Sequence, residues 1–384
     1  MDNDVRLVDG EFTALKPVDV ELRLQPRRDD GWPMELRVLG GEEYPPALLP
    51  GHLLDAADET PDDLAAALLA ALLHDTVMAM NWTALRIKYP ARRLLIRIDA
   101  AAAELHALPW EALHDGALDA AARPLATMPA TPVARYVAGS WSRPAVLPHG
   151  PMRVLVVAPQ PRDLATYDLA PLPAHATINA FRRAARLPGL DVRVAPPACS
   201  LDALSDWPAD GIHALHIVTH TLRGPDGARL LMLTGADGRA QFVTAADVAA
   251  ALQPHRAGDG AGALRLVSLA ACDAAADFGL PLAQTGIPAV LAAQGALSQT
   301  QAVDAFVRFY TRLAAHGLVD RATNDMRAML WLAHVTSLPV LFSRLAGGRL
   351  MHVRATGHAP HPSVAQHWPC ACRDDSAGGS ICEI

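Results

Sequence analysis

The stretch Leu264-Arg-Leu-Val-Ser-Leu-Ala-Ala-Cys272 is a nearly continuous apolar run that ends on a cysteine. The stretch Ile212-His-Ala-Leu-His-Ile-Val-Thr-His220 has the same character and ends on a histidine. Apolar runs of this length, without polar alternation, are typical of strands that are buried on both faces, as in a parallel sheet. Working outward, further apolar runs at 154–158 and 288–293 and a short expected strand at 191–195 are interleaved with segments of helical periodicity at 177–187, 301–316 and 321–334. This alternation predicts an α/β fold with a mostly parallel sheet flanked by helices.

The first 142 residues follow a different pattern. Residues 18–24 and 34–39 alternate polar and apolar positions, which is typical of strands with one buried face, and shorter strands are expected at 93–98 and 133–137. Thr60-Pro61-Asp62-Asp63 is expected to begin a helix that runs to about Met80, because threonine caps helices and carboxylates suit the positive end of the helix dipole. We therefore expect an N-terminal α+β lobe packed on the sheet.

Proline and glycine indicate where the domains end. The segment RPAVLPHGP at 143–151 is expected to link the N-terminal lobe, residues 1–142, to an α/β domain at 152–354. Residues 355–384 are polar, with scattered proline and a Gly-Gly pair, and predict a mobile tail.

Composition excludes several classes of protein. The 384 residues carry a formal net charge of −7, and an acidic chain without a basic run is not expected to bind nucleic acid. The longest apolar run, 65–80, is interrupted by His74 and Asp75 and is shorter than the roughly 20 residues that span a bilayer, so no membrane is expected. The acidic start Met1-Asp-Asn-Asp4 and an odd number of cysteines, five, favour a reducing cytoplasm.

His220 and Cys272 are the candidate reactive residues. Each lies at the carboxyl end of an expected strand, where ligands of open parallel sheets gather, so the two side chains can meet if the strands are neighbours. An imidazole beside a thiol favours the nucleophilic thiolate and can protonate a leaving amine. A single cysteine or histidine at a strand end is more often structural, but a histidine 52 residues before a cysteine agrees with the caspase arrangement. His216, on the same strand face but deeper, is expected to be structural.

Several segments resemble the CHAT proteases, a caspase-like family of cysteine peptidases. The resemblance covers roughly residues 10 to 350, and its two most specific blocks are His216–His220, similar to H-x-x-x-H-G, and Leu266–Cys272, similar to LVxLSAC. Weaker matches are Leu108–Leu113 to an LPWExL block, Ala289–Gln294 through Phe306–Tyr310 to the segment after the nucleophile, and Leu338–Phe342 to a closing strand. The resemblance implies a caspase-like fold and a cysteine endopeptidase, with Cys272 as the nucleophile and His220 as the general acid/base.

The same resemblance implies that the backbone N–H groups of Thr221 and Cys272 stabilise the oxyanion. Two residues depart from the family pattern. Thr221 replaces the usual glycine, and a β-branched residue disfavours positive φ. Asp273, directly after the cysteine, would oppose thiolate formation if it pointed inward. A catalytically disabled scaffold or interaction module is therefore the alternative function.

Three residues are candidates for substrate binding: Ala270, Asp273 and Gln294. In this clan the residue two before the cysteine helps to line the pocket for the substrate residue that precedes the cut. Here it is Ala270, which has neither a carboxylate nor an amide, so a neutral or apolar substrate residue is expected. Gln294 could equally cap the following turn. Trp110 is expected to anchor the two lobes to each other, and Glu111 to be solvated or paired with backbone.

No cofactor or metal is expected. Gly258, Gly260 and Gly262 precede a strand, whereas a phosphate loop needs glycines between a strand and a helix, so a flavodoxin-like ligand-binding sheet is a weaker third alternative. In the tail, His367, Cys370, Cys372 and Cys382 could ligate zinc, but the C-x-C spacing is a weak signal.

The resemblance also implies partners. It favours proteolysis in bacterial signalling or defence, with a protein substrate such as a gasdermin-like or other operon-encoded target. The chain has no tetratricopeptide array, so a regulator or sensor is expected to act in trans.

Overall fold

The computed structural model describes residues 17–53, 61–115, 123–137, 144–172, 174–184, 189–206, 211–253 and 263–353. The chain divides into two compact units, Met1–Val353 and Arg354–Ile384, and every described residue belongs to the first. The glycines at 258–262, the expected tail and its zinc candidates lie outside the described residues.

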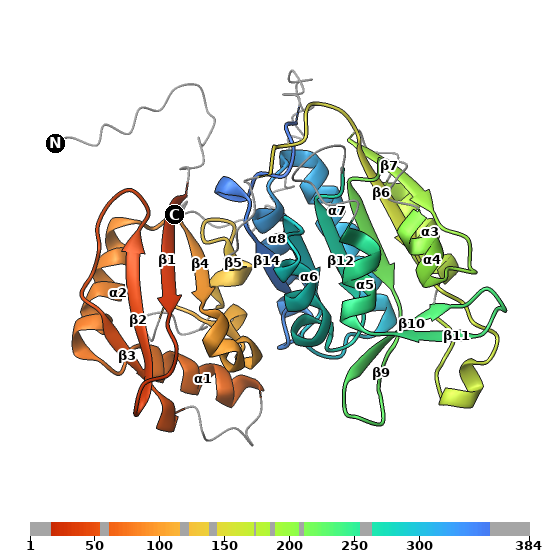
Figure 1. Cartoon of the computed structure of the whole chain (residues 1–384). Helices are drawn as coiled ribbons and strands as arrows, with labels where there is room; N and C mark the ends of the chain where they lie inside the picture. The colour runs from red at the N-terminus through yellow and green to blue at the C-terminus, as the bar shows by residue number, and fades with distance from the viewer. Residues whose placement is uncertain are drawn as a thin grey trace, which may run out of the picture. The chain divides into compact units, whose positions relative to one another are not determined.

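Eleven strands form one sheet (Figure 1). The N-terminal strands are β1 (Val18–Leu24), β2 (Gly31–Val38), β3 (Ala47–Pro50), β4 (Arg92–Ile98) and β5 (Val133–Tyr136). The C-terminal strands are β6 (Met152–Val157), β7 (Leu190–Val194), β8 (Ala214–Val218), β12 (Leu266–Ala270), β13 (Ala289–Ala292) and β14 (Val340–Ser343). Their order across the sheet is β3-β2-β1-β4-β5-β14-β13-β12-β8-β6-β7.

Most neighbouring strands run parallel, as the apolar runs predict. β13, β12, β8, β6 and β7 are all parallel to one another, and β14 closes this group as an antiparallel strand beside β13. β14 then pairs in parallel with β5 at Phe342 and Arg135. The α/β fold with a mostly parallel sheet is therefore confirmed, and the N-terminal strands join its edge and extend it. A domain boundary at 143–151 stays a prediction.

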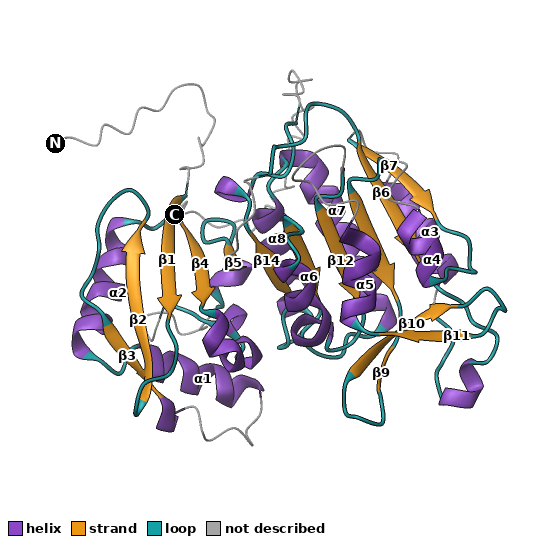
Figure 2. Ribbon diagram, viewed as in Figure 1, coloured by secondary structure: helices purple, strands orange, loops and turns teal. Residues whose placement is uncertain are grey.

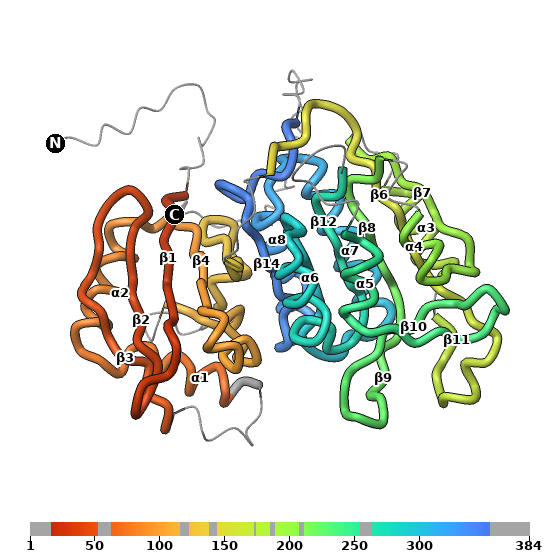
Figure 3. The backbone as a smooth tube through the Cα atoms, in the orientation of Figure 1, coloured from red at the N-terminus to blue at the C-terminus, as the bar shows by residue number. Residues whose placement is uncertain are grey.

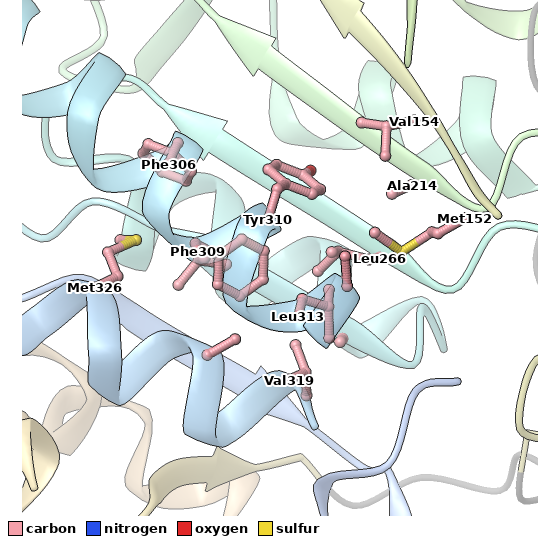
Figure 4. Close-up of a cluster of buried hydrophobic side chains, with 14 of the residues drawn as sticks. Met152, Val154, Ala214, Leu266, Phe306, Phe309, Tyr310, Leu313, Val319 and Met326 are labelled. Atoms are coloured by element: carbon pink, nitrogen blue, oxygen red, sulfur yellow. The ribbon is translucent and has the colours of Figure 1, made fainter. Parts of the chain in front are cut away.

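Helices cover both faces of the C-terminal strands (Figure 2). One face carries α3 (Ala174–Ala184), α7 (Gln299–His316) and α8 (Val319–Leu332), and Figure 4 shows Leu313 of α7 beside Leu266 of β12, with Phe309 and Phe306 further along the helix. The other face carries α4 (Leu201–Asp206), α5 (Ala245–Leu252) and α6 (Leu280–Gln284). Side chains of β8 alternate between the two faces, since Ala214 and Val218 join the first core and Leu215 and Ile217 the second.

β1 and β2 bury their apolar side chains on one face, as their alternating sequence predicts. Val20, Leu22 and Leu24 of β1 pack in a core that includes α1 (Pro61–Leu72) and α2 (Thr76–Lys88). On the opposite face Glu21 accepts a hydrogen bond of 2.7 Å from Arg37 of β2.

The expectation of one helix running to about Met80 is wrong. α1 ends at Leu72, and α2 begins at Thr76 with Asp75 as its N-cap, whose carboxylate accepts the Met78 N–H at 2.9 Å. The two helices meet at an angle of 100°. In the described part of the chain no single helix has the length and apolar character to cross a membrane, and this bent pair passes that test only when both helices are taken together.

A small second sheet follows directly from the strand that ends before His220. It contains β9 (Thr221–Arg223), β10 (Arg229–Thr234) and β11 (Ala240–Val243), all antiparallel, in the order β11-β10-β9. Figure 3 follows the chain from β8 into β9 at one end of the large sheet. This sheet was not among the elements expected from the sequence, and its strand β9 contacts the candidate site through Thr221.

Candidate active site

Two neighbouring parallel strands carry the candidate reactive residues. β8 and β12 pair in register, with Val218 opposite Ala270. His220 lies two residues beyond Val218, and Cys272 two residues beyond Ala270. Because side chains alternate along a strand, positions two apart face the same side. The structure therefore brings His220 and Cys272 to the same end and the same face of the sheet.

Hydrogen bonds confirm this register on both sides of the pair Val218–Ala270. Two residues deeper, His216 Nδ1 lies 2.8 Å from Ser268 Oγ, which in turn lies 2.7 Å from the Tyr310 hydroxyl of α7. Towards the strand ends, the Thr219 N–H donates to the Ala270 carbonyl at 3.3 Å. His216 and Ser268 have the same separation of 52 residues as His220 and Cys272, so the outer pair repeats the inner one.

His220 and Cys272 line one small cavity of about 70 Å³. The Cys272 thiol is free and exposed. Ala270 lines the cavity too, as the sequence analysis expected. None of the described residues that line the cavity carries a carboxylate. The rest of its wall is largely apolar and includes Leu172, Val218, Ala293, Leu297 and Ala302.

The His220 ring is oriented by the loop that follows β6. Its Nε2 lies 2.8 Å from the carbonyl oxygen of Ala170, in the same loop as Leu172 of the cavity wall. A carbonyl can only accept, so Nε2 carries the hydrogen in this contact. A neutral imidazole protonated at Nε2 has its lone pair on Nδ1, which can take up a proton.

Thr221 lies in the extended strand β9, and positive φ among the described non-glycine residues is confined to Asp29, Asp168, Asp273 and His334. Thr221 therefore does not adopt the positive φ that a β-branched residue disfavours. The Met232 N–H donates to the His220 carbonyl at 3.1 Å, so by antiparallel alternation the Thr221 N–H points away from β10.

The two strand ends are linked directly, because the Thr221 hydroxyl donates to the Cys272 carbonyl at 2.8 Å. In the described part of the chain the Cys272 N–H has no backbone partner, whereas the next N–H, that of Asp273, donates to the Gly295 carbonyl at 3.3 Å. The N–H groups of Thr221 and Cys272, which were expected to donate to the oxyanion, are thus not donors in these contacts.

Asp273 adopts a left-handed backbone conformation with φ of 50°, which aspartate tolerates better than most residues. Its carboxylate does not line the cavity and instead accepts a hydrogen bond of 3.1 Å from Arg229. The Asp273 carboxylate therefore does not point into the cavity, where it would oppose formation of the Cys272 thiolate.

Arg229, at the start of β10, is a residue that the sequence analysis missed. Its guanidinium also donates to the Thr221 hydroxyl at 3.1 Å and to Asp277 at 3.1 Å, in the π-helical segment Ala275–Gly279. The side chain is 11% exposed. Arg229 thus contacts the residue after His220 and the residue after Cys272.

Comparison with known proteins shows the family of the chain. The model of the CHAT domain family matches residues 62–366. The chain belongs to the CHAT domain family. A search of the curated proteins finds no match to the sequence.

Two solved structures are similar to this CHAT domain. Separase in the Saccharomyces cerevisiae separase–securin complex shares 12% identity over 73% of this chain, with a TM-score of 0.38. The Arg-specific cysteine proteinase gingipain R shares 11% identity over 77% of this chain and 71% of its own, with a TM-score of 0.43. The chain spans 18% of the length of the separase.

Gln294 lies away from the cavity of this CHAT domain, although its neighbour Ala293 lines it. Its amide accepts from Arg135 at 3.4 Å and donates to the Ala107 carbonyl at 3.3 Å. The amide therefore faces the N-terminal segment.

Two expectations for the LPWEAL turn are wrong. Trp110 packs inside the N-terminal core and donates to the Leu105 carbonyl at 2.7 Å, so it does not anchor one lobe to the other. Glu111 is 1% exposed and forms an ion pair of 2.6 Å with Arg135, so it is neither solvated nor paired with backbone.

Unlike Cys272, which is exposed, Cys199 and His216 are buried, and burial changes the pKa of each. Burial raises the pKa of the Cys199 thiol to about 12 and lowers the pKa of His216 to about 3, so both are neutral at pH 7. Across the residues that the structure describes, no group of three or more histidine, cysteine, aspartate or glutamate side chains could hold a metal ion.

Proposed function

We propose that this CHAT domain is a cysteine endopeptidase with Cys272 as nucleophile and His220 as general acid/base. The observation that carries the proposal is that both side chains line one cavity at the carboxyl ends of two parallel strands in register. The free, exposed thiol and the orientation of the His220 ring by Ala170 add support.

The acylation step begins when His220 Nδ1 takes the proton of the Cys272 thiol. The thiolate attacks the carbonyl carbon of the scissile bond, the new C–S bond forms, and the carbonyl electron pair moves to oxygen. The N–H groups of Cys272 and Thr221 donate to this oxyanion. When the oxyanion collapses, the C–N bond breaks and His220 gives its proton to the leaving amine, which leaves a thioester on Cys272.

Deacylation repeats the same proton movements with water. His220 removes a proton from a water molecule, and the water oxygen attacks the thioester carbonyl. Collapse of the second oxyanion breaks the C–S bond and releases the new carboxyl terminus, and the expelled Cys272 thiolate takes the proton back from His220. The cycle closes with the thiol and imidazole in their starting protonation states.

The cavity supports a small or apolar residue before the cut. A charged substrate residue would lose its hydration there, and no carboxylate lines the wall to compensate an arginine or lysine. Each methylene group buried in such a pocket contributes about 0.8 kcal/mol, so a short aliphatic side chain fits the wall chemistry. In a peptide library, we expect cleavage after alanine, valine or leucine to exceed cleavage after arginine or aspartate.

We place this activity in bacterial signalling or defence, where the enzyme cuts a partner protein such as a gasdermin-like or other operon-encoded target. A sensor or regulator supplied in trans would control it. A nucleophilic thiol persists best in a reducing compartment, which favours the cytoplasm.

The proposal can be tested by labelling the protein with a peptidyl acyloxymethyl ketone. The peptide carries an apolar residue at its reactive end. Mass spectrometry should locate the label on Cys272. Replacement of His220 by alanine should slow labelling and peptide cleavage by about 10² to 10⁴, the usual contribution of a general acid/base. Cys272→Ala should abolish both, and Cys199→Ala, which removes a buried thiol, is the matched control that should retain both.

Two outcomes would remove the peptidase mechanism. Cleavage of a partner protein that persists in Cys272→Ala would exclude the thiol as nucleophile. Absence of labelling and of cleavage in the native protein, with candidate partners present, would favour a catalytically disabled scaffold.

A further inference from the structure

Arg229 connects the two positions at which this chain departs from the CHAT family pattern. It donates to the Thr221 hydroxyl at 3.1 Å, where the family usually has glycine, and to the Asp273 carboxylate at 3.1 Å, directly after the cysteine. It also donates to Asp277 at 3.1 Å. One side chain of the small sheet therefore holds the strand that follows the histidine and the turn that follows the cysteine together.

The contacts orient backbone as well as side chains. The Thr221 hydroxyl accepts from Arg229 and donates to the Cys272 carbonyl at 2.8 Å. Asp273 keeps its left-handed φ of 50° while its carboxylate is held by the same guanidinium. A conformation that costs energy persists when its surroundings hold it in several places, and here Arg229 is one of those contacts.

The charges near Cys272 give Arg229 a second role. The titratable and charged groups are His220 at the end of β8, Asp273 next in the chain, Asp277 on the π-helical segment and Arg229 on β10. The loop after β6 and the start of α7 contribute neutral residues, Leu172, Gln299 and Ala302. Without Arg229, the carboxylate of Asp273, directly after the cysteine, would lose the guanidinium with which it pairs, and its charge would disfavour the thiolate.

We infer that Arg229 is a positioning residue for Cys272: it neutralises Asp273, turns that carboxylate away from the thiol, and sets the Cys272 turn against Thr221. This inference rests on the proposed function in taking Cys272 as the nucleophile. Arg229 then compensates for both departures from the family pattern, Thr221 and Asp273, so that the site can stay active.

The test measures the rate of iodoacetamide alkylation at Cys272, by peptide mapping, from pH 5 to 9. Alkylation needs no substrate and reports the thiolate directly. Arg229→Met should lower the rate at pH 7 about three- to tenfold and move the half-maximal rate to higher pH, as one uncompensated nearby charge does. Adding Asp273→Asn to Arg229→Met should restore the native pH profile. Raising the salt concentration should narrow the gap between Arg229→Met and the native protein.

Arg223→Met is the matched control. Arg223 lies opposite Arg229 in the β9–β10 pair and donates to the Gly227 carbonyl at 3.2 Å, so its loss removes the same charge from the same sheet. Its pH profile should match that of the native protein. If Arg229→Met does not fold, Asp273→Asn alone serves, and it should speed alkylation at pH 7.

An unchanged pH profile in Arg229→Met, or an altered profile that Asp273→Asn does not restore, would overturn the inference. A shifted and restored profile in a protein that cleaves no peptide would support the inference while it counts against the proposed peptidase. Equal shifts in Arg223→Met and Arg229→Met would show a general charge effect and would also overturn it.

Discussion

Acidification from pH 7 to pH 5 should destabilise this protein through histidines that are buried in their neutral form. His216 is 1% exposed, packs against Phe181 and Phe306, and shares a hydrogen bond with Ser268. Burial lowers its pKa from 6.5 to about 3. Between these two values the unfolded chain binds a proton that the folded chain does not, so stability is present above pH 6.5 and is lost as the pH falls towards 3.

The magnitude follows from the two pKa values. For one histidine with a pKa of 6.5 unfolded and about 3 folded, proton linkage removes about 2 kcal/mol of folding free energy between pH 7 and pH 5. His106 adds a similar amount, because burial and then the charge of Arg135 lower its pKa to about 3. The two histidines together should therefore cost about 4 kcal/mol over this interval, a large fraction of the stability of an ordinary domain.

Urea unfolding at pH 7 and at pH 5 measures the effect. In His216→Asn the free energy of unfolding at pH 7 should fall, but the loss between pH 7 and pH 5 should shrink by about 2 kcal/mol relative to the native protein, because one titrating group is gone. His175→Asn, at an exposed position of α3, controls for the substitution. If His216→Asn and the native protein lose the same free energy on acidification, His216 is not the buried neutral imidazole described here.

Two further substitutions test buried polar contacts through the free energy of unfolding at pH 7. Ser268→Ala should lower it by about 1–3 kcal/mol, because its two partners, one of them the Tyr310 hydroxyl, stay buried with an unmade hydrogen bond; unchanged stability would contradict the contact. Glu111→Gln should lower it by about 3–5 kcal/mol, because Glu111 faces the fully buried guanidiniums of Arg135 and Arg327; a loss below 1 kcal/mol would show that these charges are solvated or otherwise paired.

Elements with a strong hydrophobic period were predictable from the sequence. The alternation at 18–24 predicts β1 with the bounds that the structure has, and the apolar runs predict β8 and β12 to within two residues. The single helix expected through residue 75 is wrong because Asp75, which interrupts the apolar run at 65–80, is the N-cap of a second helix. The small second sheet was missed even though two turn-forming segments, 224–227 and 235–238, contain Asp and Gly in positions typical of tight turns.

The candidate site was predictable only where it depends on strand ends. His220 and Cys272 follow from two apolar runs and the rule that parallel strands present their carboxyl ends together. Arg229 could not be found this way, because its contact with Asp273 joins segments 44 residues apart and depends on the path of β10. The orientation of Gln294 depends in the same way on Arg135, 159 residues earlier in the chain. Local periodicity places a residue at an edge, but the partner of its side chain is set by tertiary structure.

The relative position of His220 and Cys272 depends on the register of β8 and β12 in the core beneath them. A slip of one residue between β8 and β12 would turn every side chain of one strand to the opposite face and separate His220 from Cys272. If β12 is the strand that turns over, the slip would leave the buried His216 imidazole, Ser268 hydroxyl and Tyr310 hydroxyl without these contacts, at about 1–3 kcal/mol for each unmade hydrogen bond. Apolar side chains alone discriminate poorly between such registers, because leucine and valine pack on either face. The inner polar contact therefore selects the one register in which the outer histidine and cysteine meet.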